Sequence, residues 1–322
     1  MPVTVLGPQR RPTLEPVARA YGPQVRFATV TAGWQEREAD DAELDGLLGG
    51  RSGNLGLHRR WHDVLDRDSE LARAEVNHRA VLDELQELYA IRLDHAVRAV
   101  EAVQRSSGRP RTRAAALADA EAALRLLDEQ HLRRVGTAQA DFDAAWRPTE
   151  RAAVAAHRAE VAALLAGAGV LVVAGGHVGV LLRLLTVFGV TATAPPAVIA
   201  WSAGAMALTE RVVLFGSGPA EVYAAGLGLL PGVVLFPHAR RRLPVDDPVR
   251  LGQLSRRFAP ARCVVLDDGV RVDLGPGGEL PPDARVVGAD GRLAPPVPAD
   301  LARVNVEEPL ETLTQPRSAE GG

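Results

Sequence analysis

The chain has 322 residues, of which 47% are hydrophobic and 24% are charged, with a formal net charge of −3. This is the composition of a globular protein long enough for one large domain or two smaller ones. The small negative charge and an aromatic content of only 4% argue against a nucleic-acid-binding surface. The single cysteine, Cys263, excludes an internal disulfide and a cysteine-rich metal site. All 37 basic residues are arginine, which excludes lysine-based nucleophilic mechanisms.

The sequence gives no sign of export or of membrane insertion. The apolar run in M-P-V-T-V-L-G-P at the N-terminus is too short for a signal peptide. The longest apolar stretches, 161–174 and 222–236, are broken by Gly or Pro before the roughly 20 residues that span a bilayer. We expect a cytoplasmic protein without membrane contact.

The first third of the chain changes pattern once. Residues 2–6 and 25–31 are predicted strands separated by a helix at 13–20, an order typical of a parallel α/β sheet. From Asp63 to Ala166 the sequence is rich in Ala, Leu, Glu and Arg, with apolar residues at helical spacing. The break S-S-G-R-P at 106–110 separates two long helices. These two helices predict an antiparallel helical hairpin inserted into an α/β domain.

The α/β pattern resumes after this insertion, which a helix at 149–166 completes. Further strands are predicted at 169–174, 197–201, 212–215 and 232–236, with a helix at 175–185. Residues 263–274, turning at Asp268-Gly269, and residues 285–293 are predicted hairpins. The chain then divides into four parts: the first part of an α/β catalytic domain (1–48), the helical insertion (49–166), the second part of the catalytic domain (167–295) and a disordered tail (296–322).

The stretch A-V-I-A-W-S-A-G-A places Ser202 between a predicted strand and a helix. In a nucleophile elbow, the residues two before and two after the serine must be small because the chain turns sharply there. Here they are Ala200 and Gly204, a relaxed form of that pattern. A plain strand–helix turn would also fit this motif taken alone.

Two other strand ends carry residues that a serine hydrolase needs. V-A-G-G-H puts paired glycines at the start of a helix, where backbone N–H groups can converge on a negative charge. This is not a dinucleotide fingerprint, because the G-x-G-x-x-G spacing is missing. His238 follows a third strand in G-V-V-L-F-P-H, and the carboxyl ends of parallel strands share one edge of a sheet. A histidine near a serine is the usual arrangement for activating its hydroxyl.

Three segments of the chain resemble, in order, the motifs of the cyanophycinase and aspartyl dipeptidase family of serine peptidases. They are V-V-A-G-G-H, A-W-S-A-G-A and G-L-G-L-L-P-G-V-V-L-F-P-H. The resemblance covers residues 2–32 and 165–275. It implies the class I glutamine-amidotransferase-like fold, a flavodoxin-like three-layer sandwich. It also implies Ser202 as nucleophile, His238 as base, and the N–H groups of Gly176 and Ala203 as the oxyanion hole.

The chain departs from the family's pattern in three ways. The dipeptidases have an aspartate between the serine and the histidine, whereas the acids here are Glu210 and Glu221. Glu210 falls along the elbow helix and is expected to point away, so Glu221 is the candidate that orients His238. The helical insertion is the second departure. The third concerns substrate recognition: the family favours acidic or β-aspartyl substrates, and here A-R-R-R-L follows the base.

Arg240 and Arg241 could clamp a substrate carboxylate in two-point hydrogen bonds, and His177 could line the mouth of the site. A solvated basic turn that balances Asp246 and Asp247 explains the arginines equally well. The sequence favours a serine peptidase or amidase that cleaves a small or acidic peptide through an acyl-enzyme, without a cofactor. The alternative is a non-catalytic binding or scaffolding protein that acts through the insertion.

The remaining histidines are weaker candidates for chemistry. His58 and His62 share a helix face near Asp63 and Asp66, which could bind a metal, but a surface segment is favoured. Glu75-x-x-His78 has the spacing of di-iron bundles but no matching second motif. We therefore expect no metal site.

The insertion is interpreted as a dimer interface, a lid over the site or a docking module. Self-association into a homodimer, or packing against the α/β core, is favoured.

Overall fold

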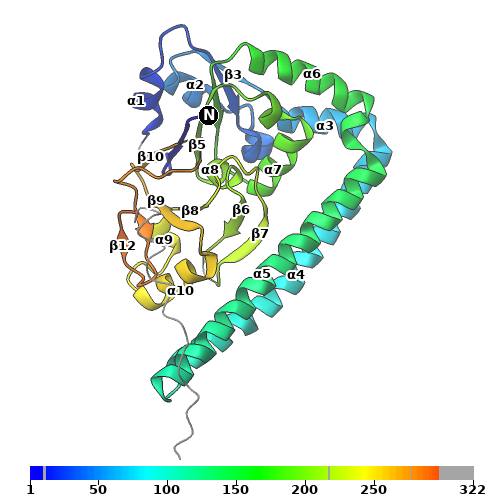
Figure 1. The fold of residues 1–322 in the computed structure, drawn as a ribbon. Helices are drawn as coiled ribbons and strands as arrows, with labels where there is room; N and C mark the ends of the chain where they lie inside the picture. The colour runs from blue at the N-terminus through cyan, green and yellow to red at the C-terminus, as the bar shows by residue number, and fades with distance from the viewer. Residues whose placement is uncertain (10–11, 217, 276, 297–322) are drawn as a thin grey trace, which may run out of the picture.

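The structure, a computed structural model, describes residues 1–9, 12–216, 218–275 and 277–296. Its main sheet has six strands in the order β10-β1-β5-β4-β2-β3 (Figure 1). Five of them run in parallel, and β10 runs antiparallel at the edge beside β1. The strands of this sheet are β1 (Val3–Leu6), β2 (Phe27–Val30), β3 (Ser52–Asn54), β4 (Val170–Val173), β5 (Ala197–Trp201) and β10 (Arg271–Leu274).

Helices cover both faces of this sheet. On one face, α1 (Leu14–Arg19) and α2 (Ala42–Leu47) pack against alternate strand residues such as Phe27 and Ile199. The other face packs against helices α3 (Leu57–Arg67), α6 (Ala152–Ala166) and α7 (Val178–Val187). Strands β1, β2, β4 and β5 are buried along their whole length, which explains why they are continuous apolar runs. The predicted α/β class with a mostly parallel sheet is confirmed.

Two smaller sheets complete the α/β part. One has the order β12-β11-β9-β8, and the other pairs β6 with β7. Their strands are β6 (Arg211–Leu214), β7 (Glu221–Ala225), β8 (Val233–Pro237), β9 (Arg262–Leu266), β11 (Val286–Val287) and β12 (Leu293–Ala294). The short elements beside them are α8 (Ala203–Ala207), α9 (Ala239–Arg242), α10 (Pro248–Phe258) and the 3-10 helices η1 (Ala32–Arg37), η2 (Pro148–Glu150) and η3 (Val190–Thr193).

One of the two predicted hairpins is confirmed and the other is wrong. Strands β11 and β12 pair antiparallel, as predicted for 285–293. At 263–274, however, β9 pairs with β8 and β11, whereas β10 leaves for the main sheet and pairs with β1. The turn itself is present, with the Val270 N–H donating to the Asp267 carbonyl at 3.0 Å. Because β10 fills the edge beside β1, the turn joins two sheets instead of two paired strands.

The insertion is a long helical hairpin, as predicted. Helices α4 (Ser69–Arg105) and α5 (Pro110–Trp146) have 37 residues each and lie side by side along the α/β part (Figure 1). The Asp68 carboxylate accepts a hydrogen bond from the Leu71 N–H, which caps the start of α4. Pro110 begins α5, where its missing N–H costs nothing.

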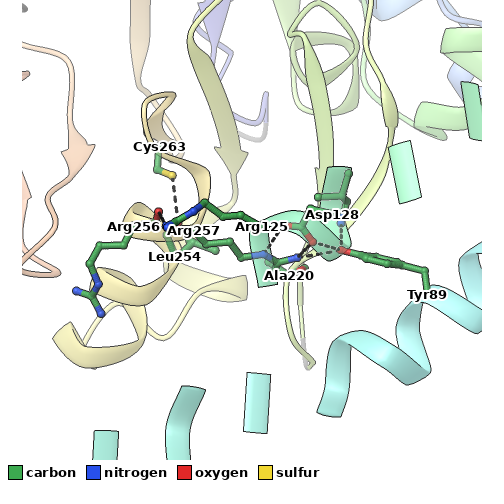
Figure 2. A network of polar contacts seen from close by, with 9 residues as sticks. Tyr89, Arg125, Asp128, Ala220, Leu254, Arg256, Arg257 and Cys263 are labelled. Carbon is green, nitrogen blue, oxygen red and sulfur yellow. Dashed lines mark hydrogen bonds and ion pairs between the residues drawn. The ribbon is translucent and has the colours of Figure 1, made fainter. Parts of the chain in front are cut away.

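Buried polar side chains fasten this hairpin to the α/β part (Figure 2). Arg257 of α10 donates to both carboxylate oxygens of Asp128 on α5, at 2.7 and 2.8 Å. The Tyr89 hydroxyl of α4 donates to Asp128 at 2.8 Å and accepts from the Val222 N–H of β7 at 3.1 Å. Asp128 is fully buried, and Tyr89 and Arg257 are nearly so. We call Tyr89, Asp128 and Arg257 the hairpin interface.

The sequence pattern does not predict strands β3 and β7. β3 is the tripeptide Ser-Gly-Asn at the sheet edge, with no apolar residue to mark it. β7 lies in an apolar stretch without clear alternation. The predicted tail at 296–322 falls outside the described residues from 297 onward. Among the helices that the structure describes, none combines the length and the apolarity that crossing a membrane requires.

Candidate active site

Ser202 lies in a strained turn between β5 and α8. Its backbone has φ 52° and ψ −126°, a conformation that costs a non-glycine residue on the order of 1–3 kcal/mol. The serine of a nucleophile elbow sits in a turn of this kind between strand and helix. The strain is therefore the first structural feature that sets Ser202 apart from an ordinary serine.

The residues around Ser202 are small because the chain approaches itself closely there. A Cβ on Gly204 would lie 2.4 Å from the Val173 carbonyl oxygen of β4. A Cβ on Gly175 would lie 2.9 Å from the Ser202 Cβ. Both positions are limited to glycine by sterics, whereas Ala200 fits as a fully buried residue.

The glycine turn after β4 packs against the segment after β2. Gly176 has φ +117°, and a Cβ on it would lie 2.2 Å from the Gly33 carbonyl oxygen. The His177 N–H donates to that same oxygen at 2.8 Å. Gly33 belongs to η1, where Gln35 also has a positive φ of 57°. Sequence reasoning missed η1 as part of this region, because T-A-G-W-Q carries no motif.

His238 reaches Ser202 from the end of β8. Its backbone is left-handed, with φ 59° and ψ 34°, and its N–H donates to the Leu266 carbonyl at 2.9 Å. The His238 Nε2 lies 3.5 Å from the Ser202 Oγ. This is the outer limit of a hydrogen bond, and such pairs are often long until a substrate binds.

Two backbone segments close to Ser202 carry the residues predicted as the oxyanion hole, Gly176 and Ala203. Ala203 is the first residue of α8, so its N–H has no partner within the helix. Gly176 lies beside Gly175, whose Cα faces the Ser202 side chain. The two residues predicted as an oxyanion hole thus flank Ser202 on neighbouring strand ends.

A cavity of about 310 Å³ includes His238, Arg240, Arg241 and Asp267 in its lining. The Arg240 N–H donates to the Asp267 carboxylate at 2.9 Å, and its exposed guanidinium lies 3.6 Å from the same group. Both predicted arginines are therefore near His238. Asp267 was missed, although its place directly after strand β9 could have marked it.

His177 caps the N-terminus of α7, its Nδ1 accepting from the Val180 N–H at 3.2 Å. Partial burial lowers the pKa of His177, and the positive charge of Arg79 on α4 lowers it further. The Tyr223 hydroxyl of β7 approaches the same place, 2.4 Å from where a Cβ of Gly179 would stand. The predicted site-mouth residue thus lies between the glycine turn and the insertion.

Glu221 lies at the start of β7, and its carboxylate accepts a hydrogen bond from the Gln86 Nε2 of α4 at 2.8 Å. Gln86 in turn lies 3.0 Å from the His131 Nε2 of α5. These contacts link Glu221 to the hairpin. Glu210, expected to point away, accepts from the Gly232 N–H at 2.9 Å.

The two histidine motifs in the insertion make structural contacts. Glu75 pairs with Arg183 of α7, and His78 stacks on Phe142 at 4.3 Å between ring centroids. The Nε2 atoms of His58 and His62 lie 3.3 Å apart on α3. Among the described residues, no group of three or more His, Cys, Asp or Glu side chains could hold a metal ion.

Comparison with known proteins gives only distant structural similarity. No family model matches the chain, and no curated protein matches it. The chain is similar to the crystal structure of a peptidase from an acI-B1 actinobacterium, with a TM-score of 0.37 and 13% sequence identity. The similarity covers 91% of this chain and 96% of that one.

Proposed function

We propose that the protein is a serine hydrolase that cleaves an amide or peptide bond through an acyl-enzyme. One observation carries this proposal: the strained Ser202, between β5 and α8, has its Oγ 3.5 Å from the His238 Nε2. A strained serine at a strand end with a histidine beside it is one arrangement that supports acyl transfer. In this proposal the catalytic domain is formed by residues 1–48 and 167–295, interrupted by the insertion at 49–166.

The proposed reaction has two halves. His238 removes the proton of Ser202 as the Oγ attacks the substrate carbonyl carbon, and the carbonyl oxygen becomes an oxyanion. The N–H groups of Gly176 and Ala203 donate to that oxyanion. His238 then gives the proton to the leaving amine, and a water molecule, deprotonated by His238, cleaves the ester bond to Ser202.

We propose that the backbone turn at 237–240 holds His238 in place. Its N–H bond to Leu266 and the Asp267 bond to the Arg240 N–H fix both ends of that turn. Glu221, the acid predicted to orient His238, is assigned to the attachment of β7 to Gln86. Glu221→Gln would then keep the reactivity of Ser202 within about threefold. A loss of about 10³ or more would return Glu221 to the triad role.

The experiment is labelling with a small fluorophosphonate, with mass spectrometry to locate the adduct. We expect one adduct, on Ser202, and its absence in Ser202→Ala and His238→Ala. Ser255→Ala is the matched control, because the Ser255 hydroxyl is bonded to the Val287 carbonyl at 2.8 Å. A folded protein that acquires no adduct would favour the alternative of a non-catalytic binding protein.

The predicted homodimer through the insertion is a separate proposal. Val81, Leu88 and Ile91 lie along one stripe of α4 and are between 45% and 58% exposed. A second copy would cover this stripe and bury its apolar surface. Light scattering after size exclusion should give twice the chain mass for the wild type and the monomer mass for Leu88→Glu/Ile91→Glu.

A further inference from the structure

The helical hairpin and the α/β part enclose a cavity of about 250 Å³. Its walls come from α4, α5, α7 and β7, and we call it the hairpin cavity. Its lining combines polar and charged side chains with an aliphatic part formed by Leu82, Val135, Leu182 and Leu227. A cavity of about 150 Å³ accepts one benzene molecule, so this space has the volume for an aromatic or branched aliphatic side chain.

One end of the hairpin cavity lies at the first turn of α7, where Gly179 and Tyr223 line it. The position of a Cβ on Gly179 is 3.1 Å from the His177 ring and 2.4 Å from the Tyr223 hydroxyl. His177 directly follows Gly176, the proposed oxyanion donor, so three positions of the chain separate that donor from the cavity lining. In our proposal, the substrate follows this short connection from Ser202 into the hairpin cavity.

The charges around the hairpin cavity balance. Its acidic and basic lining residues are Glu75, Asp83, Arg79 and Arg183, two of each sign. Glu75 and Arg183 form an ion pair with each other. Such a lining offers no excess positive charge to attract an acidic side chain. The arrangement differs from the A-R-R-R turn after His238, where three arginines are adjacent.

A glycine lines one wall of the hairpin cavity. Gly136 lies in the interior of α5, where glycine costs roughly 1 kcal/mol relative to alanine. A Cβ added to Gly136 would meet no atom within 4 Å. Gly136 is exposed and also lines the hairpin cavity, so a larger side chain can be placed at this position without a clash at its Cβ.

We propose that the hairpin cavity is the specificity pocket of this hydrolase and takes a bulky apolar side chain of the substrate, aliphatic or aromatic. This inference rests on the proposed function for the claim that the protein hydrolyses an amide or peptide bond. The preference for an apolar side chain rests on the hairpin cavity. The insertion then contributes to the site itself, by supplying the α4 and α5 walls. It also assigns the enzyme a substrate preference unlike the acidic one that the sequence resemblance implies.

The test measures binding separately from chemistry. N-acetyl-L-phenylalanine amide and N-acetyl-L-aspartic acid α-amide are titrated by NMR against Ser202→Ala, which cannot turn them over. We expect the phenylalanine amide to bind at least tenfold more tightly. Adding Gly136→Phe, which fills the hairpin cavity from α5, should weaken its binding at least tenfold. Thr137→Phe, the adjacent exposed position outside the lining, should leave binding unchanged.

Thr186→Trp fills the hairpin cavity from α7 and serves as a second variant should Gly136→Phe unfold. The proposal is overturned if the aspartic acid amide binds as tightly as the phenylalanine amide or more tightly. It is also overturned if Gly136→Phe and Thr186→Trp both bind the phenylalanine amide as tightly as Ser202→Ala alone. Fluorophosphonate labelling of the wild type separates the two claims. If the protein binds the phenylalanine amide more tightly but is never labelled, the specificity pocket is supported and the hydrolase function is contradicted. If the protein is labelled but shows no preference for the phenylalanine amide, the hydrolase function is supported and the specificity pocket is contradicted.

Discussion

The turn around Ser202 depends on the absence of side chains at the neighbouring positions. We call residues 200–204 and the glycine turn at 175–176 the Ser202 elbow. Glycines at 33, 175, 176 and 204 allow the chain segments after β2, β4 and β5 to approach one another closely. At the hairpin interface the opposite holds. Three large polar side chains, Tyr89, Asp128 and Arg257, meet in the interior and satisfy one another.

The two regions therefore fail in different ways. The elbow is sensitive to any added atom, because its neighbours are backbone carbonyls that cannot move aside. The hairpin interface is sensitive to any lost atom, because removal of one partner leaves a buried charge without compensation. The hairpin cavity depends on the attachment of the hairpin, because α4 and α5 supply two of its walls.

The largest expected effect is at the hairpin interface. Arg257→Met leaves Asp128 buried without its cation and should lower the free energy of unfolding by about 3–5 kcal/mol. Adding Asp128→Leu should recover much of that loss, because no buried charge then remains. Arg250→Met on the same helix is the matched control: its ion pair with Asp247 is exposed, and its loss should cost about 1 kcal/mol or less. Urea unfolding of the four proteins measures these differences. Equal losses for Arg250→Met and Arg257→Met would contradict the assignment.

A methyl group at the elbow should have the next largest effect. Gly204→Ala would place its Cβ 2.4 Å from one carbonyl oxygen and 2.5 Å from the next, so the free energy of unfolding should fall by about 2–3 kcal/mol. Labelling of Ser202 should fall as well, since the turn must open. In the control Gly46→Ala on α2, the added Cβ meets nothing within 4 Å, and stability should rise slightly. A neutral Gly204→Ala variant would show that the elbow is looser than described.

Cys263 provides a pH-dependent probe of the region next to the hairpin interface. Burial raises the pKa of its thiol from 9.0 to about 12, so the native thiolate fraction at pH 8 is about a thousandfold smaller than in the unfolded chain. Alkylation by iodoacetamide should therefore be slow in the native protein and faster in Arg257→Met. The protonated Cys263 thiol contributes to the free energy of unfolding below pH 9, and this contribution is lost as the pH rises towards 12. Rapid native alkylation at pH 8 would contradict the burial.

The smallest expected effect is a gain in stability. Ser202→Gly relieves the strain at φ 52° and should raise the free energy of unfolding by about 1 kcal/mol while abolishing labelling. Ser202→Ala keeps the strain and should leave stability nearly unchanged. Thermal unfolding of the two variants side by side measures the difference. The same stability in both would mean that the turn stores no strain.

The elbow could be predicted from the sequence because its residues are close in the chain. Ala200, Ser202 and Gly204 encode the turn by spacing alone, and the glycine turn and His238 follow strands that are visible as apolar runs. Strands β4 and β5 are parallel neighbours in the main sheet, as general rules for such sheets predict. The expectation that the strand before His238 shares this sheet edge is wrong, because β8 pairs with β9 in a separate sheet. Likewise, the helical periodicity and the break at 106–110 were enough to predict the hairpin.

The hairpin interface could not be predicted in this way. Tyr89 and Arg257 lie 39 and 129 positions from Asp128, and each is an ordinary polar residue in its own helix. β3 lacked any apolar signal, and β10 pairs with β1 at the opposite end of the chain. The hairpin cavity exists only because α4 and α5 pack where they do, so Gly136 carried no recognisable signal in the sequence.

The most direct test of the account is the crystal structure of the protein inactivated with the diphenyl phosphonate analogue of N-acetylphenylalanine. The account predicts a phosphorus–Oγ bond at Ser202, the phosphonyl oxygen within hydrogen-bond distance of the Gly176 and Ala203 N–H groups, and the benzyl group in the hairpin cavity. An unmodified Ser202, or an adduct whose oxygen faces away from both N–H groups, would contradict it.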